Sequence, residues 1–332
     1  MPRLTLAEMQ DIQLEEMAGD IPIDFERMSL WSTEQLRNYF ESGGSEEPPA
    51  PVSASGPPVL VAWPGVGLPK VHSLALLQHF LDCAKAGAGL VDSVNLSLAH
   101  HVEPVPSSWD EYVTYCVDTI EEVAKGRPLV FVGYSAGAVS AHSTALRLPG
   151  RVIKFVVLAM RANFLDVGRL VFGIDSAAEL SALTAQQKMG AAARAWVPDL
   201  ASLAELSEDK WPPDMKLMAA QVKIYELPFY VMYPEQARAY FGCDGAPKID
   251  APILVVASAG ETAEGERPEK MAGWSEMTTS QTCEFVTLEG VPHAMLLFPD
   301  KKSGRCEAHE RIIEHLAQMG RDSWLREAAA GQ

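Results

Sequence analysis

One serine and one histidine have the residue types and chain positions that acyl transfer requires. Residues 133–137 read Gly-Tyr-Ser-Ala-Gly with Ser135 at the centre, an apolar run at 128–132 leads into them, and a helical pattern at 138–148 follows. In a Gly-x-Ser-x-Gly elbow the chain turns sharply from strand to helix, and small neighbours permit the close approach that exposes the hydroxyl. This context predicts Ser135 as a nucleophile.

A serine hydroxyl needs a base within hydrogen-bond distance, usually a histidine held by a carboxylate. Folds that use this elbow place that histidine last in the chain. His293 lies in a loop between the apolar run 285–288 and the last helical pattern, so we predict it as the general base. His309 and His315 fall inside that last pattern and are expected at the surface. The remaining histidines precede or flank the wrong elements: His72, His79, His100, His101 and His142.

The anion formed during acyl transfer needs two backbone N–H donors, one from the residue after the nucleophile and one from a loop after an early strand. Ala136 and the turn at 64–67 occupy these places. Pro64 has no N–H, so the second donor is Val66 or Gly65, and we take Val66. A tight turn that simply needs glycine is the alternative explanation.

The elements that must position these groups alternate between strand and helix. Short apolar runs predict strands at 59–63, 93–96, 128–132, 152–160, 253–257 and 284–288. Helical patterns are predicted at 71–84, 109–124, 138–148 and about 307–319. This alternation predicts an α/β fold with a mostly parallel central sheet and helices on both faces.

Two segments depart from this alternation. Residues 1–57 carry two helical patterns and then a Gly-, Pro- and Ser-rich stretch, so we predict a helical appendage with a linker, followed by one domain at 58–332. Residues at about 161–247 are helical in pattern, rich in Ala and Met, and interrupted by prolines. We predict that this segment is an inserted helical lid.

Composition narrows the classes of function. With 27 basic and 44 acidic residues the formal charge is −17, which disfavours nucleic acid as a partner. No apolar run approaches the roughly 20 residues that span a bilayer, and the acidic N-terminus fits no targeting peptide. The five widely spaced cysteines form no metal motif and are expected as buried or incidental thiols in a reducing cytoplasm. We expect neither a metal nor a cofactor, and the sequence leaves the oligomeric state open.

Together with Ser135 and His293, the Trp-Pro-Gly-Val-Gly turn at 63–67 makes residues 59–319 resemble an α/β-hydrolase family. These are the thioesterase domains that end polyketide synthases and non-ribosomal peptide synthetases. Further similarities are the helix at 107–122, the lid, and a closing section with Trp-Ser-Glu at 274–276 and Pro-His-Ala-Met-Leu at 292–296. The elbow alone is common to all α/β-hydrolases.

The resemblance fails at one place, where synthase-terminal members carry the aspartate of the triad. That position follows the strand after the nucleophile helix and holds Met160, which cannot orient an imidazole. The other place used by related enzymes, including stand-alone editing thioesterases, is the loop after the next strand. Glu261 comes first there, Glu264 three residues later, and Asp166 at the lid entrance is a third candidate. We expect Glu261 to orient His293, with a degenerate dyad or an inactive site as the remaining alternatives.

The resemblance implies a substrate carried as a thioester on the phosphopantetheine of a carrier protein, or an acyl-CoA thioester. An acyl chain, polyketide or peptidyl, would pass to Ser135 and leave by hydrolysis or cyclisation. The lid side chains that suit a flexible acyl group are also explained by helix packing: Met189, Met215, Met218, Phe229, Tyr230 and Met232. Two alternatives remain, a carboxylesterase acting on a free small ester and a non-catalytic acyl-binding or scaffold protein.

Overall fold

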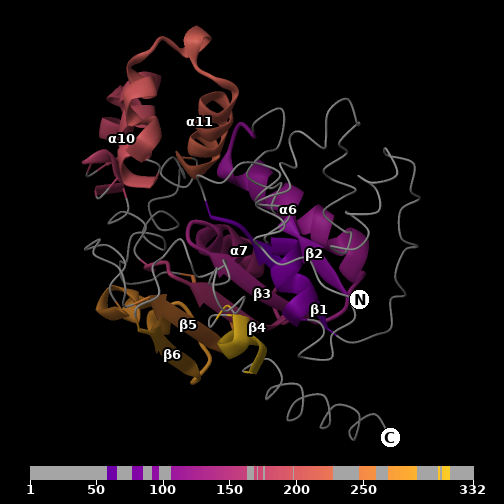
Figure 1. Ribbon diagram of the computed structural model, residues 1–332. Helices are drawn as coiled ribbons and strands as arrows, with labels where there is room; N and C mark the ends of the chain where they lie inside the picture. The colour runs from indigo at the N-terminus through magenta and orange to yellow at the C-terminus, as the bar shows by residue number, and fades with distance from the viewer. Residues whose placement is uncertain are drawn as a thin grey trace, which may run out of the picture.

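The computed structural model describes a little over half of the residues of the chain (Figure 1). The described residues are 58–65, 77–84, 92–96, 106–162, 168–169, 171–174, 176–196, 198–226, 247–258, 268–289, 306 and 309–314. The predicted appendage at 1–57 and the C-terminal residues after 314 lie outside them. Within this part of the chain, no helix combines the length and the apolar character needed to cross a membrane.

Six parallel strands form one sheet in the order β2-β1-β3-β4-β5-β6. Their bounds are β1 Val59–Trp63, β2 Ser93–Asn95, β3 Leu129–Tyr134, β4 Val152–Leu158, β5 Ile253–Ser258 and β6 Cys283–Leu288. The apolar runs form buried strands because both faces of a parallel sheet are covered. The predicted parallel sheet is therefore confirmed, and β1, β3 and β4 lie side by side at its centre.

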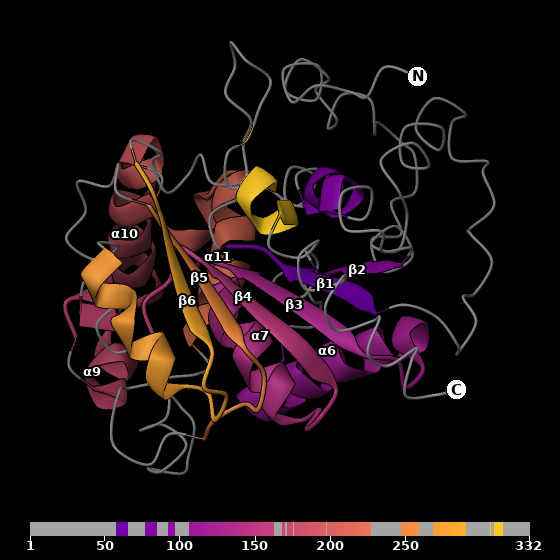
Figure 2. The same ribbon diagram turned by 90° about the horizontal axis from the view of Figure 1, so that it is seen from below.

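Helices cover both faces of this sheet (Figure 2). On one face lie α6 (Trp109–Ala124) and α7 (Gly137–Leu146), and on the other lie the short helices at 77–84 and 309–314. The N-terminus of α6 is fixed by the Ser108 hydroxyl, which accepts a hydrogen bond from the Glu111 N–H at 3.2 Å. The expected two-sided α/β arrangement is confirmed.

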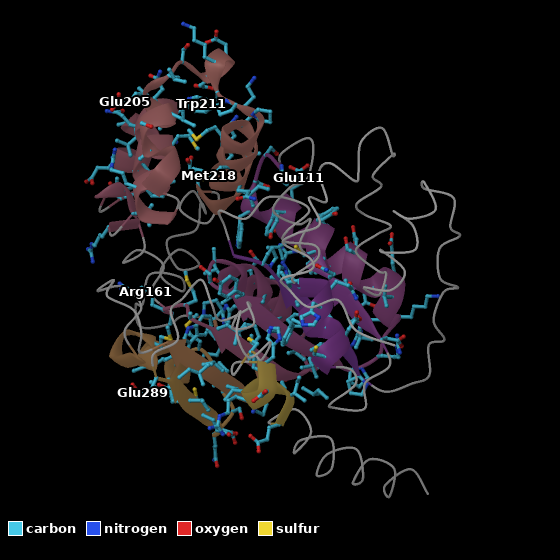
Figure 3. All side chains as sticks on the ribbon, viewed as in Figure 1. Glu111, Arg161, Glu205, Trp211, Met218 and Glu289 are labelled. Carbon is cyan, nitrogen blue, oxygen red and sulfur yellow. The ribbon has the colours of Figure 1, made fainter. Side chains whose placement is uncertain are left out.

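The described part of the segment between β4 and β5 is mainly helical. Its elements are α9 (Ala177–Ala182), α10 (Ala185–Trp196), η2 (Pro198–Glu205), η3 (Glu208–Lys210) and α11 (Pro213–Glu226). Figure 1 shows α10 and α11 standing together, apart from the helices that cover the sheet. Trp211 and Met218 lie between these two helices (Figure 3) and are buried. Met189 and Met215 are buried as well, so packing within the lid accounts for these methionines.

One expectation about exposure was wrong. His309, expected at the surface, is only 4% exposed. The helix at 309–314 packs against the helix at 77–84, and the ring centroids of His309 and Phe80 are 5.0 Å apart. Burial lowers the pKa of His309 to about 3. Phe285 lies in the strand predicted for it and is 48% exposed, since β6 is the last strand at this edge of the described sheet.

Candidate active site

The backbone at Ser135 has the geometry that a nucleophile elbow requires. Ser135 follows β3 directly and has φ +51°, a left-handed conformation that costs a non-glycine residue roughly 1–2 kcal/mol. Its N–H donates to the Leu158 carbonyl at 2.8 Å, and its own carbonyl accepts from the Ala138 N–H at 2.9 Å. The half-buried side chain therefore stands at the carboxyl end of the central strands, where α/β proteins place their ligands.

The turn after β1 lies against this serine. A Cβ added to Gly65 would be 3.0 Å from the Ser135 Cβ and 3.0 Å from the Tyr134 ring. Only a residue without a side chain lets the turn approach so closely. The turn expected to supply an anion donor is therefore next to the serine, although Val66, the donor named above, lies outside the described residues.

Ala136 is placed where its N–H can serve as the other donor. It is the N-cap of α7, and the first N–H groups of a helix have no carbonyl partner within that helix. These N–H groups and the helix dipole favour negative charge near the helix start. Ser135, Ala136 and the turn at Gly65 therefore lie next to one another at the start of α7.

The end of β4 holds no carboxylate. Met160, which replaces the aspartate expected by resemblance, is 4% exposed, and its carbonyl accepts a hydrogen bond from the Trp274 indole at 2.6 Å. Arg161 follows it, is also buried, and lies between the sheet and α10 in the view of Figure 3. Sequence reasoning missed Trp274 in this position, since nothing in the sequence pairs it with a residue 114 positions away.

The remaining predicted site residues lie outside the described residues. They are His293, Glu261 and the alternatives Glu264 and Asp166. Their flanking elements have the expected order, because β5 ends at Ser258 just before the Glu261 loop and β6 ends at Leu288 just before the His293 loop. Because all six strands are parallel, β5 and β6 end at the same edge of the sheet as β3, which Ser135 follows.

No metal centre is found among the described residues, where no group of three His, Cys, Asp or Glu side chains could hold an ion. His142, on α7, faces the rings of Phe155 and Trp274. Burial lowers its pKa to about 4, and a hydrogen bond to the backbone of Met277 opposes that shift. His142 is therefore a neutral core residue and not a second base.

A sheet of parallel strands with a serine elbow at its carboxyl edge defines the α/β-hydrolase class of fold. The model of the alpha/beta hydrolase family matches residues 31–302. Because this match spans most of the sequence, the chain belongs to the alpha/beta hydrolase family, and the predicted fold class is confirmed.

Comparisons with individual proteins give more distant likenesses. A stretch of 49 residues is 43% identical to the spectinabilin polyketide synthase system protein NorC of Streptomyces orinoci, and it spans 15% of this chain but only 2% of that protein. The RedJ thioesterase from the prodiginine pathway of Streptomyces coelicolor is 19% identical, with 81% of this chain and 96% of that chain covered and a TM-score of 0.48.

Two further solved structures have similar values. The thioesterase domain SrfTE, described as cyclising the lipopeptide surfactin, is 18% identical over 78% of this chain and 91% of that chain, with a TM-score of 0.47. A thermophilic esterase is 16% identical over 80% and 89%, with a TM-score of 0.44.

Proposed function

We propose that this chain is a serine thioesterase. It releases an acyl chain, polyketide or peptidyl, from the phosphopantetheine thioester of a carrier protein, by hydrolysis or by cyclisation through an acyl-Ser135 intermediate. The observation that carries the proposal is the strained Ser135 at φ +51°, set against the Gly65 turn and the start of α7. Strain held at a single residue by the surrounding fold is typical of a functional site.

The chemistry follows from the roles of the residues. His293 takes the proton of Ser135 as the hydroxyl oxygen attacks the thioester carbonyl, and the Ala136 and Val66 N–H groups bind the resulting oxyanion. The C–S bond then breaks, and the pantetheine thiolate receives the proton from His293. Water, or a hydroxyl or amine of the acyl chain, then attacks the acyl-serine and gives a proton to His293. The bond from the acyl carbon to the Ser135 Oγ breaks, and His293 returns that proton to the Ser135 oxygen. Glu261 holds the imidazole orientation throughout.

This mechanism requires no cofactor, since the pantetheine belongs to the substrate. The free thiols of Cys83, Cys116, Cys283 and Cys306 are compatible with a reducing cytoplasm, where synthases and their carrier proteins would supply the thioester. An acyl-CoA has the same pantetheine arm and is the simplest soluble substitute for the carrier.

The substrate class is tested by comparing a pantetheine thioester with the oxygen ester of the same acid. A thiol has a pKa near 8.5, far below that of an alcohol, so the thioester has the better leaving group. Because this chemical advantage exists without enzyme, each kcat/KM is divided by the uncatalysed rate. We expect the thioester to retain at least a tenfold preference. A corrected preference for the oxygen ester would instead identify a carboxylesterase, and no turnover of either would favour a non-catalytic acyl-binding protein.

The acid of the triad is tested by two variants in one loop. Glu261→Ala is expected to lower kcat by about 10³- to 10⁴-fold, as loss of the carboxylate does in other triads. Glu264→Ala is the matched control and should stay within a few fold of the parent. The reverse result would assign the role to Glu264, and two fully active variants would exclude this loop.

A further inference from the structure

Helices α6 and α7 meet through polar side chains and not through a purely apolar contact. We call this contact the polar seam. Its members are Trp109, Tyr112 and Cys116 on α6 and Ser140, Ser143 and Thr144 on α7. All but the half-buried Trp109 are buried, so the seam lies inside the molecule. Figures 1 and 2 both show the two helices on the same face of the sheet.

Two hydrogen bonds cross the seam. The Tyr112 hydroxyl donates to the Ser140 Oγ at 3.1 Å, and the Trp109 indole N–H donates to the Ser143 Oγ at 3.2 Å. The Trp109 and Tyr112 rings are stacked with their centroids 4.9 Å apart, so the side chains of the two donors also contact each other. Burial raises the pKa of Tyr112 well above its usual range, so its hydroxyl keeps its proton. The seam is therefore neutral and fully protonated near pH 7.

The composition of α7 explains why such directional contacts matter there. Its sequence, Gly-Ala-Val-Ser-Ala-His-Ser-Thr-Ala-Leu, consists mainly of small side chains. Small side chains make smooth surfaces on which a helix can rotate or slide with little loss of contact. A hydrogen bond fixes both a distance and a direction, so Ser140 and Ser143 set the rotation of α7 about its axis.

The seam also reaches the turn after β1. Both α6 and α7 contact β1, whose last residue, Trp63, directly precedes Pro64 and Gly65. At the start of α7, a Cβ added to Gly137 would lie 2.4 Å from the Pro64 carbonyl oxygen. A shift of α7 by a few tenths of an ångström would therefore move the turn and the Ala136 N–H relative to each other.

We propose that the polar seam positions the nucleophile elbow, with Tyr112 as its main positioning residue. Tyr112 touches neither substrate nor reacting atoms; it acts through Ser140 and α7 on Ser135 and the Ala136 N–H. This proposal rests on the proposed function, since it assumes that Ser135 reacts. Misplacement of a catalytic group by 1 Å can cost about 100-fold in rate, so a smaller displacement is expected to cost roughly tenfold.

The test compares Tyr112→Phe with Tyr115→Phe, the same substitution on the same helix at a residue that makes neither of the two cross-seam bonds. The full chain is treated with a fluorophosphonate to measure the rate at which Ser135 is labelled, and kcat and KM are measured for a pantetheine thioester. We expect Tyr112→Phe to lower both the labelling rate and kcat about tenfold with KM unchanged. Tyr115→Phe should label at the parent rate.

A third variant separates positioning from general weakening of the fold. Ser140→Ala removes the other partner of the same bond, so the double variant with Tyr112→Phe should be no slower than the slower single variant. Multiplying losses, equal losses in the Tyr115→Phe control, or labelling of Tyr112→Phe at the parent rate would overturn the proposal. A parent chain that is not labelled at all would overturn the proposed function, and the seam would then have nothing to position.

Discussion

The helix pair α6–α7 and the helix pair α10–α11 are held together by different chemistry. Hydroxyl and indole groups cross between α6 and α7 at 3.1 and 3.2 Å. In the lid, methionines lie in the interior, and an ion pair joins Lys188 to Glu226 at 2.7 Å. Hydrogen bonds specify one arrangement, whereas methionine adapts to irregular space. The pair next to the proposed nucleophile, Ser135, is therefore held in one arrangement, whereas the lid needs only to remain a packed helical unit.

Two helix glycines should respond in opposite directions to the same substitution. In Gly137→Ala the new methyl group meets the Pro64 and Trp63 carbonyl oxygens at 2.4 and 2.8 Å, so backbone must move. We expect a loss of about 3 kcal/mol in the free energy of unfolding, together with a large loss of activity. In Gly190→Ala on α10 the nearest atom is the flexible Arg194 guanidinium at 3.4 Å, and we expect a gain of about 0.5 kcal/mol.

Urea unfolding of both variants, each compared with the parent, measures this contrast. Equal responses of the two glycines would contradict the view that the elbow is the more tightly constrained region.

The lid should depend on both partners of its ion pair. Lys188→Met removes the ammonium group that offsets burial of the Glu226 carboxylate, whose side chain is 8% exposed, and we expect a loss of about 2–3 kcal/mol. Lys188→Met combined with Glu226→Leu removes both charges and should recover most of that loss. Thermal unfolding gives both values. A double variant less stable than Lys188→Met would show that the charged pair itself stabilises the lid.

Protonation of buried histidines should destabilise the sheet and its covering helices and should leave the lid unaffected. Burial holds the folded pKa of His142 at about 4, below the value near 6.5 of an unfolded histidine. The unfolded chain therefore binds the proton first, and the free energy of unfolding falls as the pH drops from about 6.5 towards 4. His309 acts in the same direction. Residues 161–247 contain no histidine, so this effect has no source in the lid.

His142→Asn removes one of these two groups. The fall in unfolding free energy between pH 6.5 and 4.5 should shrink by on the order of 1–2 kcal/mol, measured by urea unfolding at each pH. Glu289→Gln serves as a control for a carboxylate near the end of β6. An unchanged pH dependence in His142→Asn would mean that His142 takes up its proton without opposing the fold.

The sequence predicted helices and strands well because the features that define each one, its apolar spacing and its capping residues, lie within or next to it. The helix at 109–124 forms with those bounds, since Ser108 caps it and its apolar residues repeat at helical spacing. The strand predicted to reach residue 160 ends instead at Leu158, because Ala159 adopts φ +48°. Nothing in an alanine between apolar residues indicates a left-handed backbone.

Contacts between distant elements were not predictable in the same way. Ser140 and Ser143 would have the same sequence pattern on a solvated helix, and their role appears only when Tyr112 and Trp109 approach from 28 and 34 residues away. His309 was misjudged for the same reason, because its burial depends on Phe80. The position of Ser135 between a strand and a helix was predictable from the sequence, because the elbow combines strand, turn and helix in one short stretch.

The most direct test of the account is to locate the covalent intermediate. The parent chain is incubated with an acyl pantetheine thioester, quenched in acid and digested, and the acylated peptide is identified by mass spectrometry. We expect an acyl group on Ser135 alone, and we expect a Ser135→Ala variant to be unacylated and at least about 10⁴-fold slower. An acyl group on another residue, or turnover by Ser135→Ala at the rate of the parent, would contradict it.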